Sequence, residues 1–283
     1  MFRAIAVAAA LVVSAPAHAD TVRFAVTDIE GLEALQQEFG AFEEALEKSS
    51  GLEIELFPVS SRTAAVEAMN AGKVELVLTG PAEYVVLKEL ADPTIIVGWQ
   101  RPNYFAQIVT LTNGPIDNVS DLKGKTVTFG SVGSTSQHLG PAQVLADFGL
   151  SYNNDYKVQI ISRNVAVEAM IRGDVHAIGM NEGHLRSIRG AFPEVAFSVV
   201  ARGRDLPNDI LVARKDADPA MVAKIRDAFL KDGKALMSSV IKGEDNKKYE
   251  GGFFLTSIQD RNYDYVRSMY NTIGVSMNSF VGN

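Results

Sequence analysis

The sequence contains no cysteine among its 283 residues. Without thiols the chain can form no disulfide, no thiolate nucleophile and no cysteine-ligated zinc or iron–sulfur site. Positive charge is also scarce, because 27 Lys and Arg residues stand against 34 Asp and Glu residues, which gives a net charge of −7. Basic surfaces are what attract nucleic acid and anionic lipid, so neither is an expected partner of this protein.

Long apolar runs are confined to the amino terminus. Arg3 is followed by the apolar run Ala4–Val13, which breaks at Ser14 and Pro16, and Ala17-His18-Ala19 has the small-x-small pattern that signal peptidase recognises. The run is too short for a membrane-spanning helix, which needs about 20 apolar residues. We therefore expect residues 1–19 to be a signal peptide cleaved after Ala19, with the mature protein in the periplasm.

An internal repeat predicts the architecture. The segment Ser61–Val74 and the segment Ser162–Val175, offset by 101 residues, are identical at nine of 14 positions. Each copy reads as a helical segment that ends at a glycine, with an extended apolar run before it and another after it. A repeat of this kind indicates two copies of one strand–helix–strand unit.

The repeat favours an α/β fold with two lobes. We expect two α/β lobes that face each other across a central cleft and are joined by a hinge with two crossovers. Ligands of open α/β sheets bind at the carboxyl ends of the strands, so two such edges would line the cleft. The expected boundaries are lobe 1 at residues 20–110 plus 208–283 and lobe 2 at residues 111–207.

Three turns at expected strand ends carry residues suited to an oxyanion. Gly130–Ser136 lies between a strand and a helix, where hydroxyls and backbone N–H groups can surround an anion, although Ser and Thr are also ordinary helix caps. In the corresponding turn of the other repeat, next to Thr63, Arg62 adds a positively charged guanidinium that can donate two parallel hydrogen bonds to an oxyanion. Tyr84, in the turn Thr79–Tyr84, can offer its hydroxyl to the cleft or pack in the core.

Signatures of catalysis are missing. The sequence has no Gly-x-Ser-x-Gly elbow, no His-Glu-x-x-His motif and no phosphate-binding loop of the Gly-x-x-x-x-Gly-Lys type. The spacing of Gly130 and Gly133 also fails the dinucleotide fingerprint. We therefore expect a binding protein without a cofactor rather than an enzyme.

Several motifs together resemble the phosphonate, phosphite and phosphate substrate-binding proteins of ABC transporters. They are Ser134-Thr135-Ser136, the duplicated helices that end at a glycine, the segment Leu206–Lys215 and the late Tyr263-x-x-Val266-Arg267. The resemblance implies a type 2 periplasmic binding protein fold, capture of a small phosphorus oxyanion and its delivery to a membrane permease. It also implies a ligand set of Ser134, Thr135 and Ser136 at the oxygens, with Tyr84, Glu182 and Asp209 as further contacts.

The sequence departs from the family pattern at three places. Arg62 stands where aminophosphonate binders have tyrosine, Asn164 where they have histidine, and Gln137-His138 where they have a glycine–aromatic pair. Arg62 favours a small or highly charged oxyanion, whereas Glu182 and Asp209 would repel a full dianion. A protonated phosphite or phosphate, or a compact phosphonate, fits both constraints, and the protein is expected to be a monomer.

Two other interpretations remain open. The first is capture of a metal ion such as ferric iron, because nitrogen and oxygen ligands could gather around the cleft; the candidates are Tyr84, Tyr104, His138, Glu182, His184 and Asp209. The second keeps the fold and the ligand but docks the closed protein on a membrane histidine kinase instead of a permease.

Overall fold

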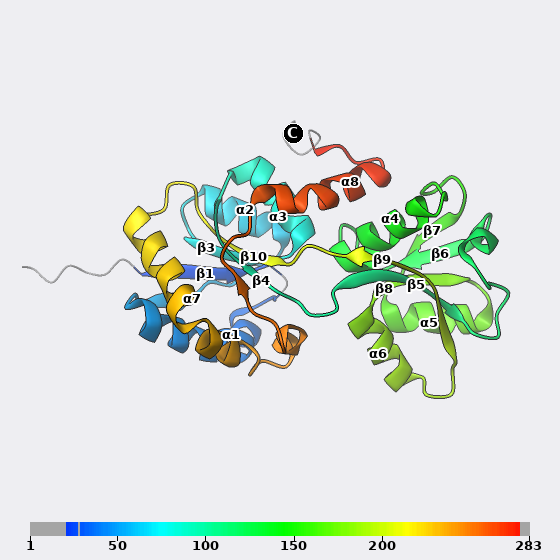
Figure 1. Ribbon diagram of the computed structural model, residues 1–283, viewed down its shortest axis with the longest axis horizontal. Helices are drawn as coiled ribbons and strands as arrows, with labels where there is room; N and C mark the ends of the chain where they lie inside the picture. Colours follow the sequence, from blue (N-terminus) through cyan, green and yellow to red (C-terminus); the bar gives the residue numbers. More distant parts are fainter. Residues whose placement is uncertain (1–20, 28, 278–283) are drawn as a thin grey trace, which may run out of the picture.

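A computed structural model describes residues 21–27 and 29–277, apart from the side chain of Arg62. The predicted signal peptide at residues 1–19 lies outside the described residues. Two lobes lie side by side along the long axis of the molecule, each built on its own mixed β-sheet (Figure 1). Among the described residues, no helix combines the length and the apolar character needed to cross a membrane.

The sheet of the first lobe has six strands in the order β11-β4-β10-β3-β1-β2. Their bounds are Phe254–Leu255 (β11), Thr94–Trp99 (β4), Asp209–Ala213 (β10), Leu76–Thr79 (β3), Val22–Val26 (β1) and Ile54–Leu56 (β2). Strands β2, β1 and β3 are parallel, whereas β10 runs antiparallel to both β3 and β4. The carboxyl ends of the parallel strands therefore meet at one edge of this sheet.

The sheet of the second lobe has five strands in the order β7-β6-β8-β5-β9. Their bounds are Lys157–Ile160 (β7), Thr126–Phe129 (β6), Ala177–Asn181 (β8), Phe105–Leu111 (β5) and Phe197–Asp205 (β9). Strands β7, β6 and β8 are parallel, and β5 is antiparallel to both β8 and β9. This order repeats that of the first lobe, with β7 in the place of β2 and β5 in the place of β10.

The predicted duplication is confirmed. Helix α2 (Arg62–Asn70) joins β2 to β3, and helix α5 (Arg163–Arg172) joins β7 to β8 in the other lobe. The two helices start at equivalent positions of the two sequence copies, and the strands after them occupy equivalent places in their sheets. Similar sequences thus fold into similar units because the same apolar pattern must cover the same kind of sheet.

The predicted lobe boundary needs a correction. The chain leaves the first sheet after Trp99 and enters the second at Phe105, and it returns between Asp205 and Asp209. A boundary at residue 110 falls inside β5, whose Ile108 is paired with Gly179 of β8 and with Ala201 of β9. The first crossover is therefore residues 100–104, several residues before the predicted boundary between residues 110 and 111. An apolar strand fits either sheet by its composition, so composition could not place this one.

Helices cover both faces of each sheet. In the first lobe, α1 (Leu32–Ser50) and α7 (Pro219–Val240) share one core, while α2 and α3 (Pro81–Ala91) pack on the other face. In the second lobe, α4 (Gly140–Asp147) lies on one face, with α5 and α6 (Glu182–Ala191) on the other. The apolar stripe of α1 is buried from Leu35 to Leu46, whereas Leu32 is 53% exposed in the first turn.

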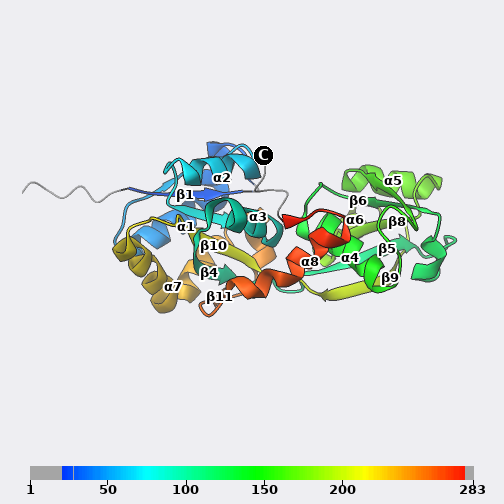
Figure 2. The same ribbon diagram turned by 90° about the horizontal axis from the view of Figure 1, so that it is seen from above.

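Helix α8 (Asp264–Thr272) connects the two lobes near the end of the chain. It packs against α3 of the first lobe and α4 of the second, and both views place it beside the two lobes (Figures 1 and 2). Its buried Val266 and Met269 belong to a hydrophobic core that also holds Ala25 of β1 and Val127 of β6. The lobes therefore share apolar packing on the side of α8.

Candidate functional site

A pocket of about 380 Å³ lies between the carboxyl edges of the two sheets. The first lobe contributes Thr27 and Thr79, which directly follow or end β1 and β3, and the crossover residues Arg101 and Tyr104. The second lobe contributes a group of polar residues, namely Ser131, Ser134, Thr135, Ser136, Asn181 and His184. We call this cavity the oxyanion pocket.

The predicted serine–threonine turn forms one wall of the oxyanion pocket. Gly133 has a positive φ of 77°, which turns the chain so that Ser134 begins a π-helical turn, Thr135–Leu139, that continues into α4. The Ser134 hydroxyl makes no capping hydrogen bond to this helix. A helix amino terminus carries partial positive charge and exposed N–H groups, so this wall is suited to a ligand's oxyanion.

The two residues after Ser134 are already held in place. The Thr135 hydroxyl accepts a hydrogen bond of 2.9 Å from the Ala82 backbone N–H of α3, which links the two lobes directly. Ser136 accepts a hydrogen bond of 2.9 Å from the Asn181 side-chain amide. Asn181 also accepts from the backbone N–H of His184 and so caps α6. These contacts fix the hydroxyls before any ligand binds.

The opposite wall holds a buried ion pair. Arg101 lies 3.5 Å from Asp209, and their side chains are 18% and 5% exposed. Burial alone would lower the pKa of Arg101, but the Asp209 carboxylate raises it above its ordinary value. Arg101 also stacks on the ring of Tyr104, with 3.8 Å between the guanidinium carbon and the ring centroid. The permanent positive charge of Arg101 thus lies across the pocket, opposite the serine–threonine turn.

One carboxylate oxygen of Asp209 accepts hydrogen bonds, and the other has no hydrogen-bond partner among the described residues. Its Oδ2 accepts from the Tyr249 hydroxyl at 2.6 Å and from Arg101. Its Oδ1 is buried and has no hydrogen-bond partner among the described residues. Because a buried carboxylate oxygen is costly to leave without a donor, this atom marks a place for a donor group on a ligand.

Tyr104 and His184 are held uncharged by their surroundings. Burial raises the pKa of Tyr104 to about 12, so its hydroxyl remains a donor at neutral pH. Burial, together with the positive charges of Arg163 and Arg101, lowers the pKa of His184 to about 3. The pocket therefore presents a neutral imidazole and a phenol beside one guanidinium.

The structure brings four of the predicted site residues together. Ser134, Thr135, Ser136 and Asp209 line the oxyanion pocket together. Thr63 lines a neighbouring, mostly apolar pocket instead. The Arg62 side chain lies outside the described residues, so its predicted contact stays a prediction.

Three further predicted contacts lie away from the oxyanion pocket. Glu182 forms an i, i+4 ion pair with Arg186 on α6, at 2.6 Å, and Asn164 is exposed on α5. His138 lies inside the second lobe, where its Nδ1 accepts from the Gly133 N–H and its Nε2 lies 2.7 Å from the Tyr152 hydroxyl. Glu182 and His138 therefore make contacts within their own lobe.

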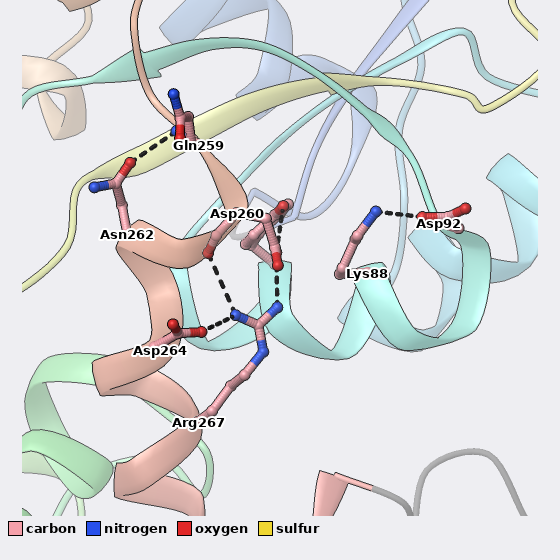
Figure 3. A network of polar contacts seen from close by, with 8 residues as sticks. Lys88, Asp92, Gln259, Asp260, Asn262, Asp264 and Arg267 are labelled. Atoms are coloured by element: carbon pink, nitrogen blue, oxygen red, sulfur yellow. Dashed lines mark hydrogen bonds and ion pairs between the residues drawn. The ribbon is translucent and has the colours of Figure 1, made fainter.

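Tyr84 is also turned away from the oxyanion pocket, contrary to the expectation that its hydroxyl faces the cleft. It is fully buried, and its hydroxyl donates to Asp260 at 2.9 Å. Arg267 donates to the same Asp260 carboxylate at 2.7 Å and to Asp264 at 2.9 Å (Figure 3). Tyr84 thus helps to fasten α8 to the first lobe.

This placement predicts the effect of Tyr84→Phe. The variant keeps the ring but loses one hydrogen bond to a charged group, which is worth about 1.5–3 kcal/mol. We expect a lower free energy of unfolding with ligand affinity within about twofold of wild type, measured by urea titration and calorimetry. A large loss of ligand affinity without a loss of stability would show that Tyr84 contacts the ligand after all.

The structure also adds residues that sequence reasoning did not assign to an oxyanion. They are Arg101, Tyr104, Asn181, His184 and Tyr249. For the metal alternative, no group of three or more His, Asp or Glu side chains that could hold a metal ion occurs within residues 21–27 and 29–277. Hydroxyl donors and two cationic side chains, Arg101 and Lys248, line the pocket beside the carboxylates of Glu83, Asp209 and Asp245, so the donors suit an anion that still carries a proton.

Two α/β lobes of repeated topology, with an anion-directed pocket between their strand ends, define the class of type 2 periplasmic binding proteins. A solved structure of PhnD1 from Prochlorococcus marinus in complex with methylphosphonate matches with a TM-score of 0.66 and 19% identity, over 90% of this chain and 98% of that one. This similarity confirms the predicted fold class.

Sequence relatives narrow the class. The phosphonates-binding periplasmic protein of Escherichia coli K12 is 24% identical over 77% of this chain and 69% of its own length. The phosphate-import protein PhnD of Mycolicibacterium smegmatis is 31% identical over 46% of this chain and 43% of its own length. The profile of the family described as ABC transporter, phosphonate, periplasmic substrate-binding protein matches residues 24–251.

The chain therefore belongs to the family of periplasmic phosphonate-binding components of ABC transporters. The family is non-enzymatic, so the expectation of a binding protein rather than an enzyme is confirmed. The resemblance drawn from the serine–threonine turn and the repeats is confirmed as well.

Proposed function

We propose that the protein binds a phosphonate, or the related phosphite or phosphate, as a singly protonated anion in the oxyanion pocket. The observation that carries this proposal is that the pocket combines several donors with one buried acceptor that lacks a donor. Hydroxyl groups at a helix amino terminus and Arg101 supply donors for the unprotonated oxygens, while the buried Asp209 Oδ1 has no hydrogen-bond partner among the described residues. A P–OH group on the ligand would donate to that oxygen.

The proposed ligand set combines residues found by sequence and by structure. Ser134, Thr135 and Ser136 bind the oxyanion from the second lobe, and Arg101 binds it from the first. Asp209 accepts the ligand's proton. Because the ligand would touch both lobes only when they are close together, its binding would stabilise the closed form by differential affinity.

The decisive test compares phosphorus ligands with sulfur ligands of the same shape. Methanesulfonate matches methylphosphonate in size, but it carries no acidic proton at neutral pH and so cannot donate to Asp209. We expect methylphosphonate, phosphite or phosphate to stabilise the purified protein by about 2.7 kcal/mol at a 100-fold excess over the dissociation constant. Methanesulfonate and sulfate should have little effect in the same thermal-shift assay.

The same panel should include 2-aminoethylphosphonate and ferric iron. An equal response to methanesulfonate would disprove the role of Asp209 as proton acceptor. A response to iron alone would overturn the oxyanion proposal in favour of metal capture.

Ser136→Ala should reduce the affinity for the responding phosphorus ligand about tenfold, because a hydrogen bond to a charged group is lost. Ser187→Ala, an exposed serine on α6, is the matched control.

We further propose that residues 1–19 direct the chain to the periplasm and are removed after Ala19, and that the closed monomer docks on an ABC permease. A sensor kinase is the other candidate partner. Deleting the gene should abolish uptake of the responding ligand if the permease is the partner. Uptake that persists, with loss of a ligand-dependent transcriptional response, would favour the kinase.

A further inference from the structure

A second pocket, of about 310 Å³, adjoins the oxyanion pocket between the lobes. Its walls are mainly aliphatic and come from helices α2 and α3, from the loop before the serine–threonine turn and from the chain around the end of α8. Ala65, Val66, Val86, Leu87, Val132 and Ile273 are among its lining residues. We call it the side pocket.

The two pockets are continuous at three residues. Thr27, Thr79 and Glu83 line both of them. The loop before the serine–threonine turn separates the cavities elsewhere, because Ser131 and Ser134 line the oxyanion pocket whereas Val132 and Gly133 line the side pocket. A molecule held at the serine–threonine turn can therefore extend past the junction into an apolar space.

The junction suits a neutral group. The hydroxyls of Thr27 and Thr79 are hydrogen-bonded to each other at 3.1 Å, so an alkyl group that passes them leaves neither hydroxyl without a partner. Glu83 is the only charged residue among the described lining residues of the side pocket, and it is 9% exposed. The mostly aliphatic lining disfavours a second anionic group on the ligand, because burying a charge without a partner is costly.

Size points the same way. Pockets of roughly 300–1,000 Å³ hold drug-sized ligands, and each of these two cavities lies within that range by itself. Methylphosphonate is far smaller than such a ligand and would leave the side pocket empty. Val132 is 66% exposed, and Leu90, which also lines the side pocket, is 37% exposed. An organic group on the ligand would bury this exposed apolar surface, which is favourable.

We infer that the ligand class is organophosphonates whose phosphorus carries a neutral alkyl or aryl group of several carbons, with that group in the side pocket. This inference rests on the proposed function and extends it. The phosphonate oxygens stay at Ser134–Ser136 and Arg101, and the organic group crosses the junction at Thr27, Thr79 and Glu83. Burial of the chain adds to the affinity that the oxyanion pocket provides.

Calorimetry with a ligand series tests the inference. Methyl-, propyl-, butyl- and benzylphosphonate would be titrated into the purified protein, with 3-phosphonopropionate as the anionic counterpart of butylphosphonate. We expect affinity to rise about fourfold for each added methylene up to butyl, which is the usual gain from burying a CH₂ group. The heat-capacity change should become more negative along the series, and 3-phosphonopropionate should bind at least tenfold more weakly than butylphosphonate.

Two variants locate the alkyl chain. Val66→Phe narrows the side pocket from α2 and should cancel most of the advantage of butyl over methyl. Val165→Phe is the matched control, since Val165 is 50% exposed on the sibling helix α5 and lines neither pocket. Val132→Asp places a carboxylate at the side pocket from another element and should lower butyl affinity about tenfold, with methyl affinity within about twofold of wild type.

The outcomes separate this inference from the proposed function. If methylphosphonate binds but affinity is flat or falls with chain length, the side-pocket inference is wrong and the proposed function stands. If the longer ligands gain affinity that neither Val66→Phe nor Val132→Asp reduces, the chain lies elsewhere and the inference is again wrong. If no phosphonate of the series binds but phosphite or phosphate does, the side-pocket inference is wrong and the proposed function stands. If phosphite and phosphate are silent as well, the proposed function itself fails.

Discussion

Replacing Arg101 with methionine is expected to reduce ligand affinity at least about 100-fold and to lower the free energy of unfolding by about 3–5 kcal/mol. The affinity loss follows from removing a charged donor that faces the anion, since hydrogen bonds to charged groups contribute about 1.5–3 kcal/mol. The remaining Asp209 charge would then repel the ligand. The stability loss follows because removing one partner of a buried ion pair leaves the other charge uncompensated.

A double variant separates the two effects. In Arg101→Met/Asp209→Asn the buried pair becomes neutral, and the amide oxygen of the new side chain can still accept from the Tyr249 hydroxyl, which lies 2.6 Å from the carboxylate in the wild type. Stability should therefore largely recover, whereas ligand affinity should not. Urea unfolding measures the first quantity, and calorimetry with the responding phosphorus ligand measures the second.

The control is Arg202→Met on β9. Arg202 also stacks on an aromatic ring, that of Phe105, and pairs with a carboxylate, that of Asp205, but its side chain is 54% exposed. Exposed pairs contribute about 0–1 kcal/mol, so both quantities should stay close to wild type. Unchanged affinity in Arg101→Met would remove Arg101 from the ligand set, and recovered affinity in the double variant would show that Arg101 acts only by neutralising Asp209.

The duplicated architecture could be predicted because its signal is repeated. Ser61–Val74 and Ser162–Val175 share the residues that face a core, and similar apolar patterns bury similar surfaces. The turn Ser134–Ser136 could also be predicted, because a glycine-rich link between a strand and a helix places hydroxyls at the sheet edge. The position of β5 could not, since its apolar composition satisfies either sheet.

The wrong predictions for Tyr84 and Glu182 both concern the first turn of a helix, where the exact starting residue decides which side chain faces the pocket. Helix α3 begins at Pro81, so successive side chains rotate by about 100°, and Glu83 faces the pocket while Tyr84 points into the core. At α6 the cap Asn181 and the third helical residue His184 face the pocket, whereas Glu182 does not. A shift of one residue at a helix terminus thus decides which side chain meets the ligand.

Arg101 was missed for a related reason. It lies in the crossover at residues 100–104, and the sequence placed that crossover several residues later. Nothing in its local sequence distinguishes it from a surface arginine. Only the return of β10 beside β4, with Asp209 paired to Trp99, brings the carboxylate close to Arg101. A contact of this range depends on topology, which local patterns do not specify.

The second large effect concerns pH and the buried His138, which is 3% exposed. Its Nδ1 accepts a hydrogen bond of 3.1 Å from the Gly133 N–H, so a proton on that nitrogen would face another N–H group. The facing group on its other side is the Tyr152 hydroxyl, whose pKa is raised by burial and which stays neutral. Burial lowers the pKa of His138 from 6.5 to about 4.

The direction of the pH effect follows from this lowered pKa. Between pH 6.5 and pH 4 the unfolded chain binds a proton at His138 and the folded protein does not, so acid stabilises the unfolded state. The contribution to stability is fully present above pH 6.5 and is lost as pH falls. At pH 4.5 the loss due to His138 should be about 2 kcal/mol. His184, with a pKa of about 3, should add a loss of similar size.

His138→Gln tests this prediction, because glutamine can accept from Gly133 and cannot titrate. Urea unfolding of wild type and variant would be measured at pH 7.5, 6.5, 5.5 and 4.5. The stability of wild type minus that of the variant should fall by about 2 kcal/mol toward low pH. Carboxylates titrate in both proteins, so their effect cancels in the difference. The loss should be smaller again in His138→Gln/His184→Gln. If stability depends on pH in the same way for wild type and His138→Gln, then His138 titrates alike in the folded and unfolded states. The prediction that its buried imidazole stays neutral beside the serine–threonine turn would then be wrong.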